Sequence, residues 1–128
     1  MPTALELTRE QWRPYIEAAR QRPAPPALTL AEQQQREQLL ARARQVAAEL
    51  KSRFKAERVI VFGSLASAEW FTPNSDVDLA VEGLTADNYW SAWRLAEEMI
   101  KTRPVDLIEM ETAKESLRRA ILRYGIEL

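Results

Sequence analysis

The sequence contains neither cysteine nor histidine among its 128 residues. Without cysteine, the chain can form no disulfide framework and no thiolate metal site. Without histidine, it has no imidazole base and no histidine-bound zinc. Any catalysis by this chain must therefore use carboxylates, hydroxyls, amines or a hard cation.

The sequence also lacks a long hydrophobic run and an excess of charge of one sign. No apolar segment reaches membrane-spanning length and the N-terminus has no secretory apolar core, so we expect a cytoplasmic protein. Eighteen basic and 19 acidic residues leave a net charge of −1, which gives no signal for nucleic acid or an anionic membrane. With 46% hydrophobic residues, the chain is predicted to be one soluble globular domain with a modest core.

The first 35 residues are predicted to form an extension outside that domain. Apolar side chains recur at helical spacing in residues 8–20, although Pro14 opposes a regular helix there. Residues 22–29, RPAPPALT, are typical of a stiff linker. We therefore expect a helical arm and linker in residues 1–35 and a domain in residues 36–128. Whether the arm packs on its own domain, exchanges between copies in a homo-oligomer or binds a partner is left open.

A long helix is expected to connect the extension to the domain. Thr29 and Glu32 have the spacing of a capping box, and the helical pattern continues to about Phe54. The apolar positions of this helix fall on one stripe, which we expect to be buried: Leu39, Leu40, Ala43, Val46, Ala47 and Leu50.

From Arg58 the pattern becomes that of strands alternating with helices. Three strands are predicted at 59–62, 76–81 and 105–108, with a short edge strand at 126–128. One helix is expected at 86–101, capped by Thr85, and another at 113–124, ended by Gly125 at a C′ position. The predicted fold class is α/β of the α+β type, a small mixed sheet flanked by helices.

Three aspartates lie within the predicted strands. Because side chains alternate along a strand, Asp76 and Asp78 point to one face while the apolar residues between and after them point to the other. Asp106 lies likewise inside the third strand, so neighbouring strands would bring the three carboxylates together. Such a cluster is unfavourable when bare, and a hard divalent cation such as Mg²⁺ relieves the repulsion.

A turn at Gly63-Ser64 follows the first strand. A strand that ends in Gly-Ser before a helical start directs free backbone N–H groups and one hydroxyl toward a single point. That arrangement suits a phosphate, and its position ahead of the acidic strand gives the dipeptide its significance.

Gly63-Ser64, eleven intervening residues, Asp76-Val77-Asp78 and the later Asp106 together resemble the DNA polymerase β-like nucleotidyltransferase superfamily. The resemblance covers about residues 36–128. It implies the polymerase β-like fold, Asp76, Asp78 and Asp106 as the catalytic metal triad, and Gly63 and Ser64 as nucleotide contacts. It further implies two Mg²⁺ ions and transfer of AMP from ATP to a hydroxyl, with Asp106 as the proton acceptor or a ligand of the second metal.

Within that superfamily, the chain resembles the minimal nucleotidyltransferases of toxin–antitoxin pairs, which act with HEPN-domain partners. The resemblance implies a HEPN-type toxin as partner and a tyrosine hydroxyl as acceptor. The turn departs from the family pattern, because Ser67 and Ala68 replace a basic residue and a glycine. Two alternatives stay open: an inactive antitoxin that neutralises its partner by binding alone, and a transferase acting on a small molecule.

Other conspicuous residues are expected to have structural roles or none. Trp93 is predicted to belong to the core, and Arg118 and Arg119 to a solvated helix face. Glu109 and Glu111 are expected beyond the third strand, as ordinary surface acids.

Overall fold

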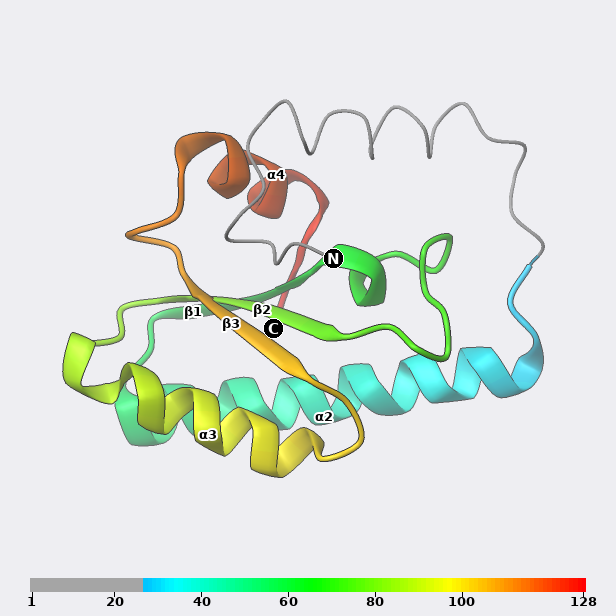
Figure 1. Ribbon diagram of the computed structural model, residues 1–128, viewed down its shortest axis with the longest axis horizontal. Helices are drawn as coiled ribbons and strands as arrows, with labels where there is room; N and C mark the ends of the chain where they lie inside the picture. Colours follow the sequence, from blue (N-terminus) through cyan, green and yellow to red (C-terminus); the bar gives the residue numbers. More distant parts are fainter. Residues whose placement is uncertain (1–26) are drawn as a thin grey trace.

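A computed structural model describes residues 27–128 (Figure 1). The helix expected at residues 8–20 and most of the expected linker lie outside the described residues. The elements follow in the order α2 (Leu30–Phe54), β1 (Arg58–Phe62), η2 (Gly63–Ala66), β2 (Val77–Glu82), η3 (Ala86–Asn88), α3 (Tyr89–Ile100), β3 (Val105–Glu109), α4 (Glu115–Tyr124) and β4 (Ile126–Glu127).

The four strands form one mixed sheet in the order β3-β2-β1-β4. β1 is antiparallel to both β2 and β4, whereas β2 and β3 are parallel. Helices α2 and α3 cover one face of the sheet, and α4 covers part of the other (Figure 1). The predicted fold class, a small mixed sheet flanked by helices, is confirmed.

Helix α2 begins as the sequence predicted. The backbone N–H of Glu32 donates to Thr29 Oγ1 at 3.1 Å, and the Thr29 N–H donates to Glu32 Oε1 at 3.0 Å. This capping box satisfies two donors that a helix start leaves without partners. The six apolar residues of the expected stripe are all buried. α2 continues without a break through residue 35. The division of the chain into an arm of residues 1–35 and a domain of residues 36–128 stays a prediction.

Alternation along β2 separates two apolar layers. Val77, Leu79 and Val81 belong to the larger core between the sheet and helices α2 and α3. Ala80 points the other way, into a smaller core under α4 with Phe62 and other buried residues. Asp78 shares the α4 face with Ala80, because residues two apart in a strand point the same way.

The start of the helix expected at residue 86 differs from the prediction. Residues 86–88 form a single 3₁₀ turn, and the α-helix begins at Tyr89. Thr85 has an extended backbone and its side chain makes no capping hydrogen bond. The tighter 3₁₀ turn therefore replaces the first α-helical turn that a side-chain cap would have supported.

Helix α4 begins at Glu115, two residues later than expected, and Gly125 ends it in an unexpected way. Gly125 has φ −78°, so it does not take the left-handed conformation of a C′ glycine. A Cβ at this position would lie 2.5 Å from Ile121 O and 2.5 Å from Ile60 Cγ2. Glycine is needed here for space, because the chain passes directly under α4 to enter β4.

None of the helices within residues 27–128 combines the length and apolar character that a membrane crossing requires.

Gly125→Ala should therefore destabilise the fold by about 1–3 kcal/mol, since the added methyl group forces backbone and core atoms apart. Urea unfolding followed by circular dichroism measures the loss. Arg123→Ala, an exposed change on the same helix, serves as the control and should cost less than about 1 kcal/mol. Equal effects of the two substitutions would contradict the steric role of Gly125.

Candidate functional site

The candidate site lies at the end of the sheet where β1 ends and both β2 and β3 begin. In register, Phe62 at the end of β1 pairs with Asp78, and Asp78 pairs with Asp106 across the parallel strands. Gly63 follows β1 directly and begins η2. Two of the predicted acidic residues and the Gly-Ser turn are thus brought together by strand pairing.

The carboxyl groups of Asp78 and Asp106 are half-buried and hydrogen-bonded to each other. Burial raises the pKa of Asp78 to about 7, with further contributions from the charges of Asp106 and Asp76 and from the hydrogen bond to Asp106. Burial and then the charge of Asp76 also raise the pKa of Asp106, while the hydrogen bond with Asp78 opposes that rise. Burial and neighbouring negative charge therefore disfavour ionisation of both carboxyl groups when no cation is bound.

Asp76 lies one residue before β2, and its side chain is exposed. Its charge acts on both other carboxyl groups. Within residues 27–128, however, no group of three acidic side chains is arranged to hold a metal ion by itself. Asp78 and Asp106 form the contact pair, and the three-carboxylate ligand set stays a prediction.

The Gly63-Ser64 turn packs against this acidic pair. Gly63 has φ +73°, a left-handed conformation that favours glycine. A Cβ on Gly63 would lie 2.4 Å from Asp78 Oδ2, so only glycine lets the turn approach the carboxyl group this closely. Ser64 is half-buried next to it. On the far side of the turn, Arg36 of α2 donates from Nε to Leu65 O at 3.1 Å and fixes η2 to the helical layer.

Helix α3 holds β3 from its free edge. Trp93 Nε1 donates to Val105 O at 2.6 Å, and the Tyr89 hydroxyl donates to Leu107 O. These two carbonyls flank Asp106 and have no strand partner, because β3 is the last strand of the sheet. Trp93 also packs against the larger core, which confirms its predicted placement. The two aromatic side chains fix the strand that carries Asp106.

A shallow groove of about 570 Å³ lies on the outer side of α3, lined by Trp90, Trp93, Arg94, Glu97 and Glu98. Trp90 is 68% exposed and stacks on Trp93 with 5.5 Å between ring centres. All five lining residues belong to α3, and none of the three aspartates lines this groove.

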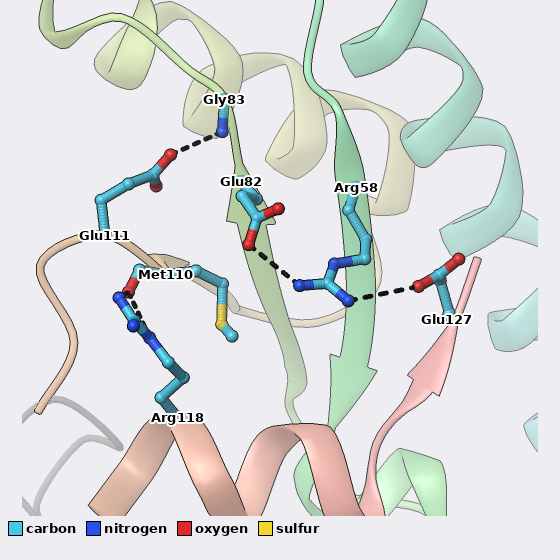
Figure 2. Close-up of polar contacts among 7 residues, drawn as sticks. All are labelled: Arg58, Glu82, Gly83, Met110, Glu111, Arg118 and Glu127. Atoms are coloured by element: carbon cyan, nitrogen blue, oxygen red, sulfur yellow. Dashed lines mark hydrogen bonds and ion pairs between the residues drawn. The ribbon is translucent and has the colours of Figure 1, made fainter. Parts of the chain in front are cut away.

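The charged residues at the other end of the sheet are paired (Figure 2). Arg58 of β1 lies 2.9 Å from a Glu82 carboxylate oxygen and 3.8 Å from one of Glu127. Glu111 accepts a hydrogen bond from the Gly83 N–H at 2.8 Å. Glu111 is exposed, as predicted for a surface acid. These contacts hold the strand ends together.

Arg118 and Arg119 are both exposed on α4, as predicted for a solvated helix face. The Arg118 guanidinium also donates twice to Met110 O, at 3.2 and 2.8 Å (Figure 2). Arg119 is exposed and pairs only with Glu115 of the same helix, as a surface position would. Glu109 is the last residue of β3 instead of lying beyond it.

Sequence reasoning missed the arginines that hold the loops beside the acidic strand. Arg36 bonds the turn after β1, and Arg103 bonds the loop before β2. Both donate to backbone carbonyls that are distant in sequence. Nothing in the sequence distinguishes these two arginines from the others, because their acceptors carry no side-chain signature.

A mixed sheet with paired carboxylates beside a Gly-Ser turn defines a domain of the nucleotidyltransferase type. Residues 44–128 match the family model described as polymerase beta, nucleotidyltransferase. The chain belongs to this family.

Solved structures with the same fold agree with the assignment. One, assigned as a minimal nucleotidyltransferase, is 32% identical with a TM-score of 0.61, and the match covers 73% of this chain and 95% of that chain. A chain of the MntA–HepT toxin–antitoxin complex is 20% identical with a TM-score of 0.53, covering 69% of each. A variant of that complex is 22% identical with a TM-score of 0.55, covering 66% of this chain and 69% of that chain. The two complexes show likeness of fold alone. No curated protein matches the sequence.

The raised pKa of Asp78 predicts an unusual dependence of stability on pH. The folded state holds a proton up to about pH 7, whereas the unfolded chain releases it near pH ~4. The folded state thus binds more protons between these values, and in metal-free buffer the free energy of unfolding should fall as pH rises between them. The contribution of Asp78 is about 2–4 kcal/mol across this range.

Asp78→Asn should remove this decline, and urea unfolding at pH 5 and pH 8 in the presence of a chelator measures it. Asp87→Asn, the same change at an exposed aspartate in η3, is the matched control and should keep the decline. Parallel pH profiles for the wild type and Asp78→Asn would show that the carboxyl titrates normally.

Proposed function

We propose that this protein is a Mg²⁺-dependent nucleotidyltransferase that moves AMP from ATP to a tyrosine hydroxyl of a HEPN-type toxin, and so acts as the antitoxin. The observation that carries the proposal is the in-register contact of Asp78 with Asp106 beside Gly63-Ser64. Belonging to the nucleotidyltransferase family supports the reaction type.

The residues of the site fit a hard divalent cation. Asp78 and Asp106 offer adjacent carboxylate oxygens, and burial followed by neighbouring negative charge raises the pKa of both carboxyl groups. Magnesium in proteins is commonly bound by one or two carboxylates, with waters and substrate phosphates as the other ligands. In this proposal Asp78 and Asp106 hold the metal, and Asp76 adds a third carboxylate from the residue before β2. Two bound ions would neutralise charge on the attacking and leaving oxygens.

The remaining groups of the site have roles toward the nucleotide and the acceptor. Gly63 lets the triphosphate approach the backbone beside the acidic pair, and the Ser64 hydroxyl donates to a phosphate oxygen. Asp106 accepts the proton of the attacking hydroxyl. The acceptor oxygen then bonds to the α-phosphorus, the bond from that phosphorus to the bridging oxygen of the β-phosphate breaks, and pyrophosphate leaves.

A protein acceptor is favoured over a small molecule. None of the three aspartates lines the groove on α3. In this proposal the acceptor is therefore a hydroxyl group of a partner protein. The likeness to a chain of a toxin–antitoxin complex supports a toxin as that partner.

A binding-only antitoxin is the second candidate, favoured by Ser67 and Ala68 in the turn. Ser67 takes an extended backbone directly after η2, and its Oγ accepts the Glu69 N–H at 3.3 Å. This side chain supplies no cation to a triphosphate. An inactive protein would keep the acidic pair but fail to bind the nucleotide productively.

Magnesium with ATP should raise the melting temperature of the wild type, because a ligand that binds only the folded state stabilises it. At 100 times the dissociation constant the gain is about 2.7 kcal/mol. Asp78→Asn should lose most of this shift, whereas Asp87→Asn should keep it. Differential scanning fluorimetry with and without MgCl₂ and ATP measures both. An unchanged wild-type melting temperature at millimolar Mg-ATP would contradict the proposed site.

Transfer itself is tested by incubating the protein with a HEPN-type partner and ATP labelled at the α-phosphate. Label should appear on a partner tyrosine with release of pyrophosphate.

The double change Asp76→Asn and Asp78→Asn should remove transfer but keep complex formation, since it alters charge and little volume. Ser64→Ala should reduce transfer less, because one hydrogen bond to a charged group contributes about 1.5–3 kcal/mol. A wild type that neutralises the toxin without any transfer would favour the binding-only antitoxin.

A further inference from the structure

The loop that leads into β2, residues 67–76, is held by Arg103. This arginine lies in the connection between α3 and β3. Its Nη1 donates to Ser75 O at 2.9 Å and reaches Thr72 O at 3.4 Å. The guanidinium also lies 5.7 Å from the ring centre of the buried Phe71. One side chain therefore contacts three residues of the loop.

The loop is also closed on itself next to Arg103. Thr72 N–H donates to Ser75 Oγ at 2.8 Å, and Ser75 N–H donates to Thr72 O at 3.0 Å. Ser75 is 7% exposed, the one buried polar residue within the described part of the chain. The turn at residues 72–75 is thus a compact unit, and the arginine fastens it to the start of β3.

This unit determines where Asp76 lies. The Ser75 carbonyl that Arg103 binds belongs to the peptide group joining Ser75 to Asp76. On the other side, the Val77 N–H donates to Pro104 O at 3.1 Å. The backbone of Asp76 is therefore held on both sides by residues 103 and 104, which lie three and two residues before Asp106. The exposed side chain of Asp76 depends on this backbone for its position relative to the acidic pair.

We propose that Arg103 is a positioning residue of the site, holding Asp76 where its carboxylate joins Asp78 and Asp106 around the cation. The inference rests on the proposed function. A guanidinium suits the role, because its planar set of donors can bind two carbonyls and stack on an aromatic ring at once. Residues that orient metal ligands from outside the ligand set commonly change metal affinity about 10–100-fold when removed.

The sign of the effect separates positioning from simple electrostatics. Arg103 places a positive charge at the same end of the sheet as the three acids. If charge alone mattered, its removal would strengthen the binding of a divalent cation. If Arg103 positions Asp76, its removal weakens that binding.

The experiment titrates MgCl₂ against the full chain at fixed ATP and follows the melting temperature. Arg103→Ala should raise the Mg²⁺ concentration at half-maximal shift by about tenfold or more. Arg94→Ala, the same change on the exposed outer side of α3, is the matched control and should change it less than about twofold. Arg103→Lys should fall between them, since an ammonium group keeps the charge without the planar fork.

A double variant tests whether Arg103 acts through Asp76. Adding Arg103→Ala to Asp76→Asn should cause no further loss of Mg²⁺ affinity, and full additivity would overturn the inference. Hydrogen exchange on the metal-free protein should show faster exchange of the amides of residues 72–77 in Arg103→Ala. Unchanged exchange would equally overturn it.

The outcomes for the inference and for the proposed function are distinguishable. A wild type that responds to Mg²⁺, together with an Arg103→Ala variant of equal or higher Mg²⁺ affinity, overturns the positioning role and leaves the proposed function standing. A wild type without any Mg²⁺ response overturns the proposed function, and the role of Arg103 toward a metal with it.

Discussion

Parallel pairing of β2 with β3 places two carboxyl groups side by side on one sheet face, and the surrounding structure accommodates this arrangement. Burial first, and then the charge of neighbouring carboxylates, raises the pKa values of Asp78 and Asp106, so the pair opposes folding near neutral pH when no cation is bound. Position 63 requires glycine for two reasons: its backbone is left-handed, and the Asp78 carboxyl leaves no room for a Cβ. Tyr89 and Trp93 fix the carbonyls on either side of Asp106.

The two ends of the sheet differ in how their acidic side chains are paired. At the end with Arg58, the half-buried Glu82 meets a guanidinium, which stabilises both charges (Figure 2). At the other end, the carboxyl group of Asp78 lies next to the carboxyl group of Asp106. The nearby Arg103 directs its donors to backbone carbonyls. An arrangement that disfavours the metal-free fold is typical of a site built for a ligand.

Several elements could be predicted because their signals are local. The capping box at Thr29 and Glu32, the stripe of α2 and the alternation of β2 follow from periodicity and neighbouring side chains, and the structure confirms them. Predictions failed where longer-range contacts prevailed. Gly125 serves the close passage of the chain beneath α4 instead of a left-handed cap.

The sequence by itself determined which residue types were available for chemistry: with no cysteine or histidine, the carboxylates and the Gly-Ser turn remained. It also determined that Asp76 and Asp78 flank an apolar position of one strand. The tertiary structure alone decided that Asp106 pairs with Asp78, because strand order and register depend on contacts between distant segments. It alone decided which arginines hold the adjoining loops, because backbone carbonyls accept hydrogen bonds without regard to the side chain that carries them.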